Sequence, residues 1–366
     1  MKKNVVVMFG GVSSEHNVSL WSSRYIIESL NKEPEKYSVF PVGITRNGEW
    51  FLYTGSVEHI AADAWLEDKK NVYPALLSPS RCSEPLFILK NGKYETKRVD
   101  VMFPVFHGKN GEDGTIQGLC ELANIPYVGC DVYSSSACMD KVFTNILLTE
   151  HRINKARYTW FFAYDYIKSP QGAINSVDSW ANGKYPVFVK PARSGSSVGI
   201  SKVLNKEELK PAIEKALESD SKILIEEGID AREVECAVLG DGDDIFTSVL
   251  GEVIPFNNFY DYESKYSKNS KLVEEARLSI DVKSRIEEIA KNAYRILGCS
   301  GLSRVDFLLE KDTDKIFLNE INTMPGFTEI SMYPKLMLKS GFTMSKILEK
   351  LIIFANKKKA VKDATK

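Results

Sequence analysis

The first 130 residues alternate between short apolar runs and stretches whose apolar residues have helical spacing. Apolar runs at 4–9, 99–105 and 125–129 are typical of buried strands, and the first of them stops at Gly10-Gly11. Between the first two runs, apolar residues recur over 18–30 at intervals typical of a helix. This alternation predicts an α/β fold with an N-terminal doubly wound parallel sheet, whose ligands bind beyond the C-terminal ends of the strands.

The rest of the chain divides into two further units and a tail, so that the first unit spans 1–129. Over 130–221, a helical stretch, a strand, a Gly/Ser loop and a capped helix predict a second α/β unit. A new strand opens a third unit over 222–356. Its polar, aromatic-rich loop at 257–275 is typical of a lid, although packing against a neighbouring domain is the alternative. The basic residues of 357–366 predict a frayed, solvated C-terminus.

Composition removes several classes of function. Lys and Arg total 48 and Asp and Glu total 49, so the chain lacks the basic excess that general nucleic-acid or membrane-surface binding needs. The first apolar run is too short for a signal peptide or for a membrane span of about 20 residues. The 4 histidines and 6 cysteines do not fall at metal-ligand spacings. We therefore expect a cytoplasmic protein with reduced thiols and no nucleic-acid or membrane partner.

The strongest candidate for chemistry is a pair of strands near the end of the chain. Alternation places Arg304 and Asp306 on one face of the first strand, and Glu320 and Asn322 on one face of the second. If the strands pair across their short turn, two carboxylates, an amide oxygen and a guanidinium share one surface. Oxygen ligands without histidine or cysteine fit Mg²⁺. The alternative from the pattern alone is a salt-bridged hairpin that faces solvent.

Three glycine-containing turns are weaker candidates. The loop after Lys190 supplies a cation, hydroxyls and backbone amides suited to phosphates, although it is not a Walker A loop and a flexible turn is the alternative. His107, in a glycine-rich turn, either contacts a ligand or caps that turn. Glu15 presents a carboxylate after Gly10-Gly11, where it either binds a ligand or favours the following helix N-terminus.

Seven segments share a mixture of glycines with charged or hydroxyl side chains at fixed spacings. In chain order they are Gly10-Gly-x-Ser-x-Glu-His, His107-Gly-x-x-Gly-Glu-Asp-Gly, Met139-Asp-Lys, Val189-Lys-Pro-Ala-Arg-x-Gly-Ser-Ser-Val-Gly, Phe259-Tyr-Asp-Tyr-x-x-Lys-Tyr, Ser303-Arg-Val-Asp-Phe and Asn319-Glu-Ile-Asn-Thr-Met-Pro-Gly-Phe-Thr. Together they resemble the D-alanine–D-alanine ligase family of ATP-grasp enzymes. The resemblance covers nearly the whole chain and implies three α/β domains, with ATP held between the central and C-terminal units.

The resemblance also implies a role for each matched residue. For ATP and its metal ions, the implied contacts are Lys141, Lys190 and Lys265 with the phosphates, the Ser196-Ser197 loop over them, Glu226 with the adenine, Glu233 with the ribose, and Asp306, Glu320 and Asn322 with two Mg²⁺ ions, for which Mn²⁺ is a substitute. For the amino acids, Glu15, Ser196 and Tyr266 would hold the first D-alanine and the lid, Arg304 and the Gly326 backbone the oxyanion, and Ser331 the second carboxylate. A homodimer is expected by family analogy.

The second substrate is the point on which the sequence is divided. The segments 43–50 and 271–276 resemble the D-alanine–D-serine ligases of vancomycin resistance. Lys265-Tyr266 predicts an amine nucleophile, because lactate-using relatives lack this pair. Met332, an apolar neighbour of Ser331, favours D-alanine. We therefore predict D-alanine with measurable use of D-serine.

The chain departs from the family pattern at two places, and two alternative functions remain open. Asn17 and the stretch 152–157 differ from the family, and neither is expected to touch the chemistry. The alternatives are another ATP-grasp carboxylate–amine ligase and a catalytically inactive nucleotide-binding regulator.

Overall fold

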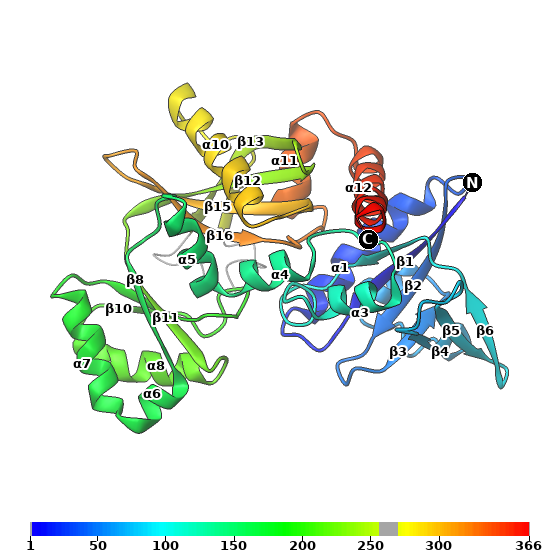
Figure 1. Cartoon of the computed structure of the whole chain (residues 1–366), viewed down its shortest axis with the longest axis horizontal. Helices are drawn as coiled ribbons and strands as arrows, with labels where there is room; N and C mark the ends of the chain where they lie inside the picture. The colour runs from blue at the N-terminus through cyan, green and yellow to red at the C-terminus, as the bar shows by residue number, and fades with distance from the viewer. Residues whose placement is uncertain (1, 256–269, 366) are drawn as a thin grey trace.

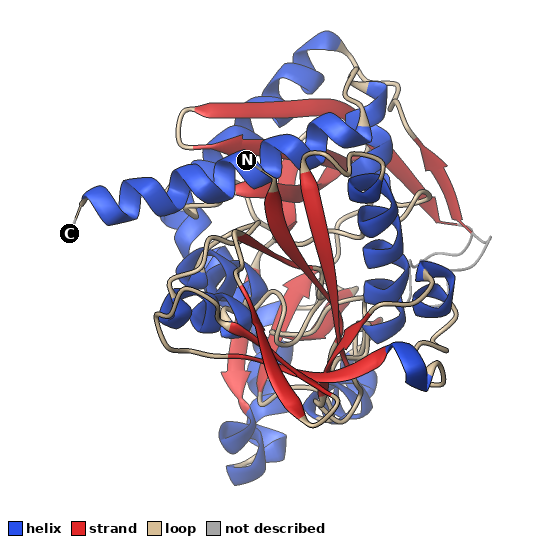
Figure 2. Ribbon diagram, turned by 90° about the vertical axis from the view of Figure 1, so that its right-hand side faces the viewer, coloured by secondary structure: helices blue, strands red, loops and turns tan. Residues whose placement is uncertain are grey.

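The computed structural model describes residues 2–255 and 270–365, and its secondary structure gathers into three β-sheets. One sheet holds seven strands, one four and one five. In Figure 1 they occupy three separate parts of the molecule, joined by the helices of the centre, and Figure 2 shows the same strands between helices from the side. Among the described residues, no helix combines the length and apolar character needed to cross a membrane.

The N-terminal sheet has a parallel centre with helices on both faces. Its strand order is β6-β5-β4-β3-β2-β1-β7, and β1 pairs in parallel with both β2 and β7. Alternate residues of β1 face opposite ways: Val5 packs in the core that contains α1, and Val6 in the core that contains α3. The elements are β1 (Lys3–Gly10), α1 (His16–Asn31), β2 (Tyr37–Ile44), β3 (Trp50–Tyr53), α2 (Val57–Ala61), η1 (Lys69–Asn71), β4 (Val72–Leu77), β5 (Leu86–Lys90), β6 (Lys93–Lys97), β7 (Val101–Pro104) and α3 (Thr115–Ala123).

The predicted doubly wound sheet is therefore confirmed, with two differences in its strands. Residues 46–98, for which no elements were predicted, contribute the antiparallel strands β3 to β6. The predicted strand at 125–129 is reduced to a single parallel bridge between Tyr127 and Met102.

The four-stranded sheet is antiparallel, in the order β10-β9-β11-β8. Helices α6, α7 and α8 cover it, and Ile213 of α8 packs in the same core as Val189 of β9. Because β11 lies inside this sheet, the predicted boundary at residue 222 falls within it; the domain limits as a whole stay predictions. The elements are α4 (Val132–Met139), α5 (Lys141–Glu150), β8 (Tyr158–Phe162), α6 (Ala163–Lys168), α7 (Pro170–Ala181), β9 (Val187–Pro191), β10 (Ser201–Val203), η2 (Lys206–Glu208), α8 (Leu209–Leu217) and β11 (Lys222–Glu227).

The five-stranded sheet has the order β14-β13-β12-β15-β16 and carries cores on both faces. Cys236 of β12 packs with α10, whereas the next residue, Ala237, packs with α11 and α12. Ser279 starts α10 by accepting a hydrogen bond from the Val282 amide at 3.3 Å. The elements are β12 (Ala231–Asp241), β13 (Asp244–Pro255), β14 (Ser270–Val273), α10 (Ile280–Ile296), β15 (Gly301–Glu310), β16 (Ile316–Asn322), α11 (Met332–Lys339) and α12 (Met344–Ala364).

The basic C-terminal segment is helical, so the predicted frayed tail is wrong. Helix α12 continues to Ala364 and lies between the five-stranded and N-terminal sheets. Lys358 donates to the Gly129 carbonyl at 2.8 Å, and its ammonium lies 4.0 Å from the centre of the Tyr127 ring. Lysine side chains cover apolar surface while their charged ends reach polar partners, and this stabilises a basic helix end that composition alone suggests is loose.

Candidate active site

Strands β15 and β16 place four polar side chains opposite one another. They pair antiparallel, with Arg304 opposite Asn322 and Asp306 opposite Glu320. Arg304 grips Asp306 through two hydrogen bonds of 2.7 Å, and the Asn322 amide donates to Asp306 at 3.0 Å. The Arg304 and Asp306 side chains are only 18% and 13% exposed. The predicted shared surface is confirmed, and it is not a solvent-facing hairpin.

Electrostatics hold Arg304 charged. Burial by itself would lower the pKa of Arg304, but the carboxylates of Asp306 and Glu235 raise it well above its ordinary value. The Glu235 carboxylate lies 3.3 Å from the guanidinium. A fixed positive charge therefore stands on this face, where it can stabilise a developing anion.

The oxygen donors of this face fit a divalent cation. Among the described residues, no three His, Cys, Asp or Glu side chains converge on one point, and this set is two carboxylates with one amide. Hard oxygen donors on a rigid strand pair suit Mg²⁺, which keeps waters and phosphate oxygens for the rest of its shell. Asp306, Glu320 and Asn322 are the residues that would hold it.

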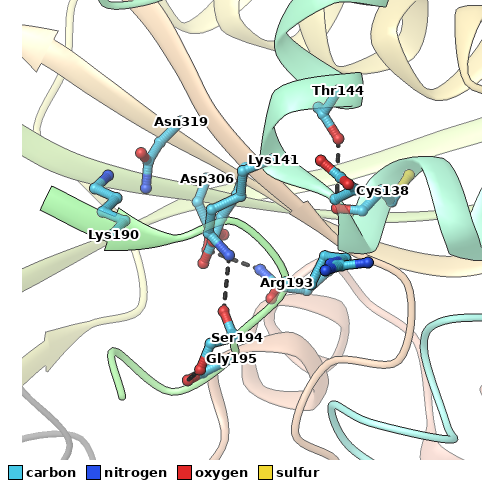
Figure 3. Close-up of polar contacts among 12 residues, drawn as sticks. Cys138, Lys141, Thr144, Lys190, Arg193, Ser194, Gly195, Asp306 and Asn319 are labelled. Carbon is cyan, nitrogen blue, oxygen red and sulfur yellow. Dashed lines mark hydrogen bonds and ion pairs between the residues drawn. The ribbon is translucent and has the colours of Figure 1, made fainter. Parts of the chain in front are cut away.

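Two lysines reach this face from the four-stranded sheet and its connecting helix. Lys141 begins α5, and its ammonium lies 2.9 Å from the Ser194 carbonyl and 3.4 Å from the Glu320 carboxylate. In Figure 3 the Lys141 side chain points between Asp306 and the loop that carries Ser194. Lys190, at the end of β9, pairs with Glu226 of the neighbouring strand β11 at 2.6 Å. Two sheets thus contribute cations and carboxylates to one space.

The Lys190–Glu226 pair is charged. Burial opposes the charge on each partner, yet Glu226 raises the pKa of Lys190, with further help from Glu320 and Glu233. Lys190 in turn lowers the pKa of Glu226, and Asn145 donates to that carboxylate at 3.0 Å. Glu233, the predicted ribose ligand, therefore lies close enough to this pair to influence it.

Glu15 is held by loops from three parts of the chain, in what we call the Glu15 clamp: Glu15, Gly108, Gly195 and Ser196. The Ser196 hydroxyl donates to the Glu15 carboxylate. A Cβ atom on Gly108 or Gly195 would lie 2.5 or 2.6 Å from the same carboxylate, so neither position has room for a side chain. Glu15 precedes α1, yet its side chain makes no capping hydrogen bond. Its carboxylate is therefore placed for contacts across the loops rather than for the helix.

The clamp lies beside a cavity of about 430 Å³ and a strained loop. The cavity is lined by the turn that carries Glu15, by Arg46 and by residues 193–195, among others. Ser196 and Ser197 have backbone φ angles of 49° and 58°, which non-glycine residues rarely adopt. Such strain is retained where the surrounding structure demands it, and it clusters at functional sites.

Both ring nitrogens of His107 have protein partners, and neither partner lies in the glycine-rich turn that carries His107. Its Nδ1 lies 2.8 Å from the Met324 carbonyl and its Nε2 lies 3.0 Å from the Ser22 hydroxyl. The carbonyl can only accept, so Nδ1 carries the proton and Nε2 accepts from Ser22. The Ser22 oxygen in turn accepts from the Phe327 amide at 3.1 Å. Burial lowers the pKa of His107, which keeps the ring in this neutral form.

Gly326 and Ser331 are neighbours, as their predicted shared role requires. A Cβ atom on Gly326 would lie 3.0 Å from the Ser331 hydroxyl oxygen, which contacts the Thr328 hydroxyl at 2.7 Å. Met332 differs from expectation. It is buried, and its sulfur would lie 2.8 Å from a Cβ on Gly251, so the side chain packs against β13 in the core. Its apolar character is therefore accounted for by packing in the core.

Two residues near the site were missed by sequence reasoning. Glu112 accepts the Gly108 amide at 2.8 Å and the Met324 amide at 2.9 Å, and burial, with Glu15 nearby, raises its pKa to about 8. The sequence feature that could have identified Glu112 is its position in the motif that begins at His107. Lys155 donates to the Asn319 carbonyl at 2.5 Å, so the stretch 152–157 reaches β16 beside Glu320.

The predicted lid is mostly beyond what the structure describes. Lys265 and Tyr266 fall outside the described residues, as does the predicted lid up to residue 269. Its end forms β14, which pairs antiparallel with β13.

Family models described as "D-ala D-ala ligase N-terminus" and "D-ala D-ala ligase C-terminus" match residues 4–130 and 147–353. A D-alanine–D-alanine ligase of Caldicellulosiruptor bescii is 46% identical, over 100% of this chain and 98% of the relative. One of Clostridium acetobutylicum is 46% identical, over 97% of this chain and 98% of the relative.

Solved structures agree with the sequence matches. The VanG D-Ala:D-Ser ligase of Enterococcus faecalis superposes with a TM-score of 0.87 at 42% identity, covering 97% of this chain and 100% of the other. The D-alanine–D-alanine ligase of Coxiella burnetii also gives 0.87, at 32% identity, covering 100% of this chain and 97% of the other. The predicted α/β ATP-grasp architecture is confirmed, and the chain belongs to the D-alanine–D-alanine ligase family.

Proposed function

We propose that this enzyme uses ATP and Mg²⁺ to join two D-alanine molecules, and that the dipeptide serves peptidoglycan synthesis. One observation carries the proposal: the Lys141 ammonium of the central unit lies 3.4 Å from Glu320, on the strand pair that holds Arg304 and Asp306. Cations for a polyphosphate and oxygen ligands for a metal therefore face the same space. The relatives named as D-alanine–D-alanine ligases support this choice of substrates.

The chemistry suits these residue types. A carboxylate is a poor acyl donor, and transfer of the ATP γ-phosphate to the first D-alanine converts it into an acylphosphate. A divalent ion held by Asp306, Glu320 and Asn322 would offset the negative charge of the crowded phosphate oxygens. Lys141 and Lys190 add positive charge to the same space.

The second step is attack of the other D-alanine's amine on the acylphosphate. Arg304, held charged by its carboxylate neighbours, would stabilise the tetrahedral oxyanion together with the Gly326 backbone. Phosphate then leaves. Ser331, adjacent to Gly326, would hold the second carboxylate. Water must be kept out, because it would hydrolyse the acylphosphate, and we assign this role to the segment 257–275.

The first D-alanine would be held by the Glu15 clamp, with the Tyr266 hydroxyl as a further partner. For ATP, Glu226 would contact the adenine and Glu233 the ribose, with the Ser196-Ser197 loop and Lys265 over the phosphates. We further propose that the enzyme acts in the cytoplasm as a homodimer. Its mass in solution by light scattering tests the dimer.

A second candidate is a D-alanine–D-serine ligase. It is favoured by the VanG match at 42% identity and by the segments 43–50 and 271–276. The discrimination between D-alanine and D-serine should be limited, because a small apolar pocket rejects an added hydroxyl by only about 10²-fold.

The test is mass spectrometry of the product formed from equimolar D-alanine, D-serine and D-lactate with ATP and Mg²⁺. We expect D-alanyl-D-alanine as the main product, with D-alanyl-D-serine detectable. A higher kcat/KM for D-serine would select the second candidate, and a depsipeptide would exclude both. No D-alanine-dependent release of ADP would leave only a non-catalytic role.

A further inference from the structure

The connection between α5 and β8 is fastened to β16 next to the proposed metal ligands. The Leu318 amide donates to the Asn154 carbonyl at 3.0 Å, and the Lys155 ammonium donates to the Asn319 carbonyl at 2.5 Å. Asn319 precedes Glu320 in the chain. Lys155 lies in a connection, outside the strands of both sheets. Its ammonium reaches the region where Lys141 and Lys190 approach the proposed metal ligands of β15 and β16.

Lys155 differs from the other lysines of this region in what it faces. Lys141, Lys190 and Lys222 have carboxylates at 3.4, 2.6 and 2.9 Å respectively. Over residues 2–255 and 270–365, no carboxylate lies within 4.0 Å of the Lys155 ammonium, whose acceptor is an uncharged carbonyl. The Lys155 side chain is partly buried, and an ammonium taken partly out of water without a carboxylate in contact is costly. An anionic ligand would supply what the protein does not.

The surroundings of Lys155 identify the class of anion. The pKa of Lys155 is lowered to about 8, chiefly by burial and also by the neighbouring Lys190 and Lys141, while Glu226 and Glu320 act in the opposite sense. These are the residues to which we assign the nucleotide and its metal. Three lysines from three elements thus converge where the phosphates of ATP are proposed to lie.

We propose that Lys155 is a third lysine of the nucleotide-phosphate site, binding the polyphosphate of ATP and ADP beside Lys141 and Lys190. The inference rests on the proposed function, since it takes ATP as the ligand of this space. An ammonium has three N–H donors, and the Asn319 carbonyl uses one. The others are available to phosphate oxygens. The stretch 152–157 thus carries a binding residue at a place where the chain departs from its family's pattern.

The competing explanation is that Lys155 only ties the connection to β16. Calorimetric titration with ADP and with adenosine, at fixed Mg²⁺, separates phosphate binding from a purely structural role. The proteins to compare are the wild type, Lys155→Met, Lys155→Gln and Lys155→Arg. Gln keeps a donor for the Asn319 carbonyl without the charge, and Arg keeps the charge. Lys202→Met, at an exposed position of β10, is the matched control for loss of a lysine.

We expect the Met and Gln variants to bind ADP about 10- to 100-fold more weakly, the range for a hydrogen bond to a charged group. Adenosine binding should be unchanged in every variant, and the Arg variant should lose least. ADP binding by Lys155→Gln at the wild-type level, or equal losses for ADP and adenosine, would overturn the inference. Wild-type enzyme that makes no D-alanyl dipeptide would instead overturn the proposed function, whatever the variants bind.

Discussion

The strand pair β15–β16 and the Glu15 clamp both present carboxylates to the candidate active site, but they are built in opposite ways. In the strand pair, Asp306 meets Arg304 two residues away and Asn322 sixteen residues away. In the clamp, Ser196 meets Glu15 across 181 residues of sequence. A regular hydrogen-bonded ladder fixes the first arrangement, whereas the second depends on the docking of separate loops.

The strand pair is therefore the more rigid part of the site, and the Glu15 clamp is the more adjustable part. Strand pairing fixes the spacing of side chains on one face, so the backbone of the β15–β16 face should move little when a ligand binds. The clamp depends on glycines that allow close approach and on serines with strained backbones. We expect the chemistry to be most sensitive on the strand pair and substrate affinity to be most sensitive in the clamp.

The largest effect should come from the metal face. Glu320→Gln removes one negative charge from the site that we propose holds a divalent ion, so turnover should fall by more than about 10³-fold, beyond the loss of a single oxyanion donor. Melting temperature should stay near that of the wild type. Glu310→Gln, at the far end of β15, is the control and should keep full activity. Unchanged turnover and Mg²⁺ dependence in Glu320→Gln would exclude this residue as a metal ligand.

Arg304 should come next. Arg304→Met should lower kcat by about 10²- to 10³-fold with little change in ATP affinity, because we propose that the guanidinium stabilises the developing oxyanion. Its removal also leaves Asp306 and Glu235 without their cation, so thermal melting must be measured alongside. Arg304→Lys keeps the charge but loses the two-pronged contact, and should retain part of the activity. Loss mainly of ATP binding would show that Arg304 contacts phosphate instead.

The clamp should give a smaller effect, expressed in affinity for the first D-alanine. Ser196→Ala removes a hydrogen bond to a carboxylate, so we expect KM for this substrate to rise about 10- to 100-fold. Glu15→Gln should act through the same contact, and the double variant should therefore lose less than the sum of the two. Fully additive losses would show that the two residues act separately.

The smallest effect should be a pH dependence of stability set by His107, which links the N-terminal and C-terminal motifs. Its pKa is lowered in the folded protein, so the unfolded chain takes up a proton first as pH falls below about 6.5. Stability is therefore lost in that range. The raised pKa of Glu112 works in the opposite sense between about 4.5 and 8, so the difference between wild type and a variant is the informative quantity.

His107→Gln should be less stable than wild type at pH 7.5, by about 1–2 kcal/mol, and the gap should narrow toward pH 5. Unfolding in urea at both pH values measures it, with the exposed His151→Gln as control. A gap that stays constant would mean that protonation of His107 does not couple the two motifs to folding.

The features that could be predicted from the amino-acid sequence are those that depend on local order. Alternation along two strands joined by a short turn was enough to place Arg304, Asp306, Glu320 and Asn322 on one surface. The parallel centre of the N-terminal sheet likewise followed from strand, helix and glycine in turn. In each case the partners are neighbours in the chain or obey the geometry of a single element, so their positions follow from the backbone period.

Contacts between segments that are distant in the sequence follow from the folded arrangement and could not be predicted from the chain. These contacts are the hydrogen bonds of Ser196 with Glu15, of His107 with the Met324 carbonyl and of Lys155 with the Asn319 carbonyl. The burial of Met332 in the core is of the same kind. So is the contact that holds the basic end of α12 against the N-terminal unit. None of these pairings has a period or spacing that the chain could display, because each depends on how completed sheets and loops pack and on which charges that packing leaves without water.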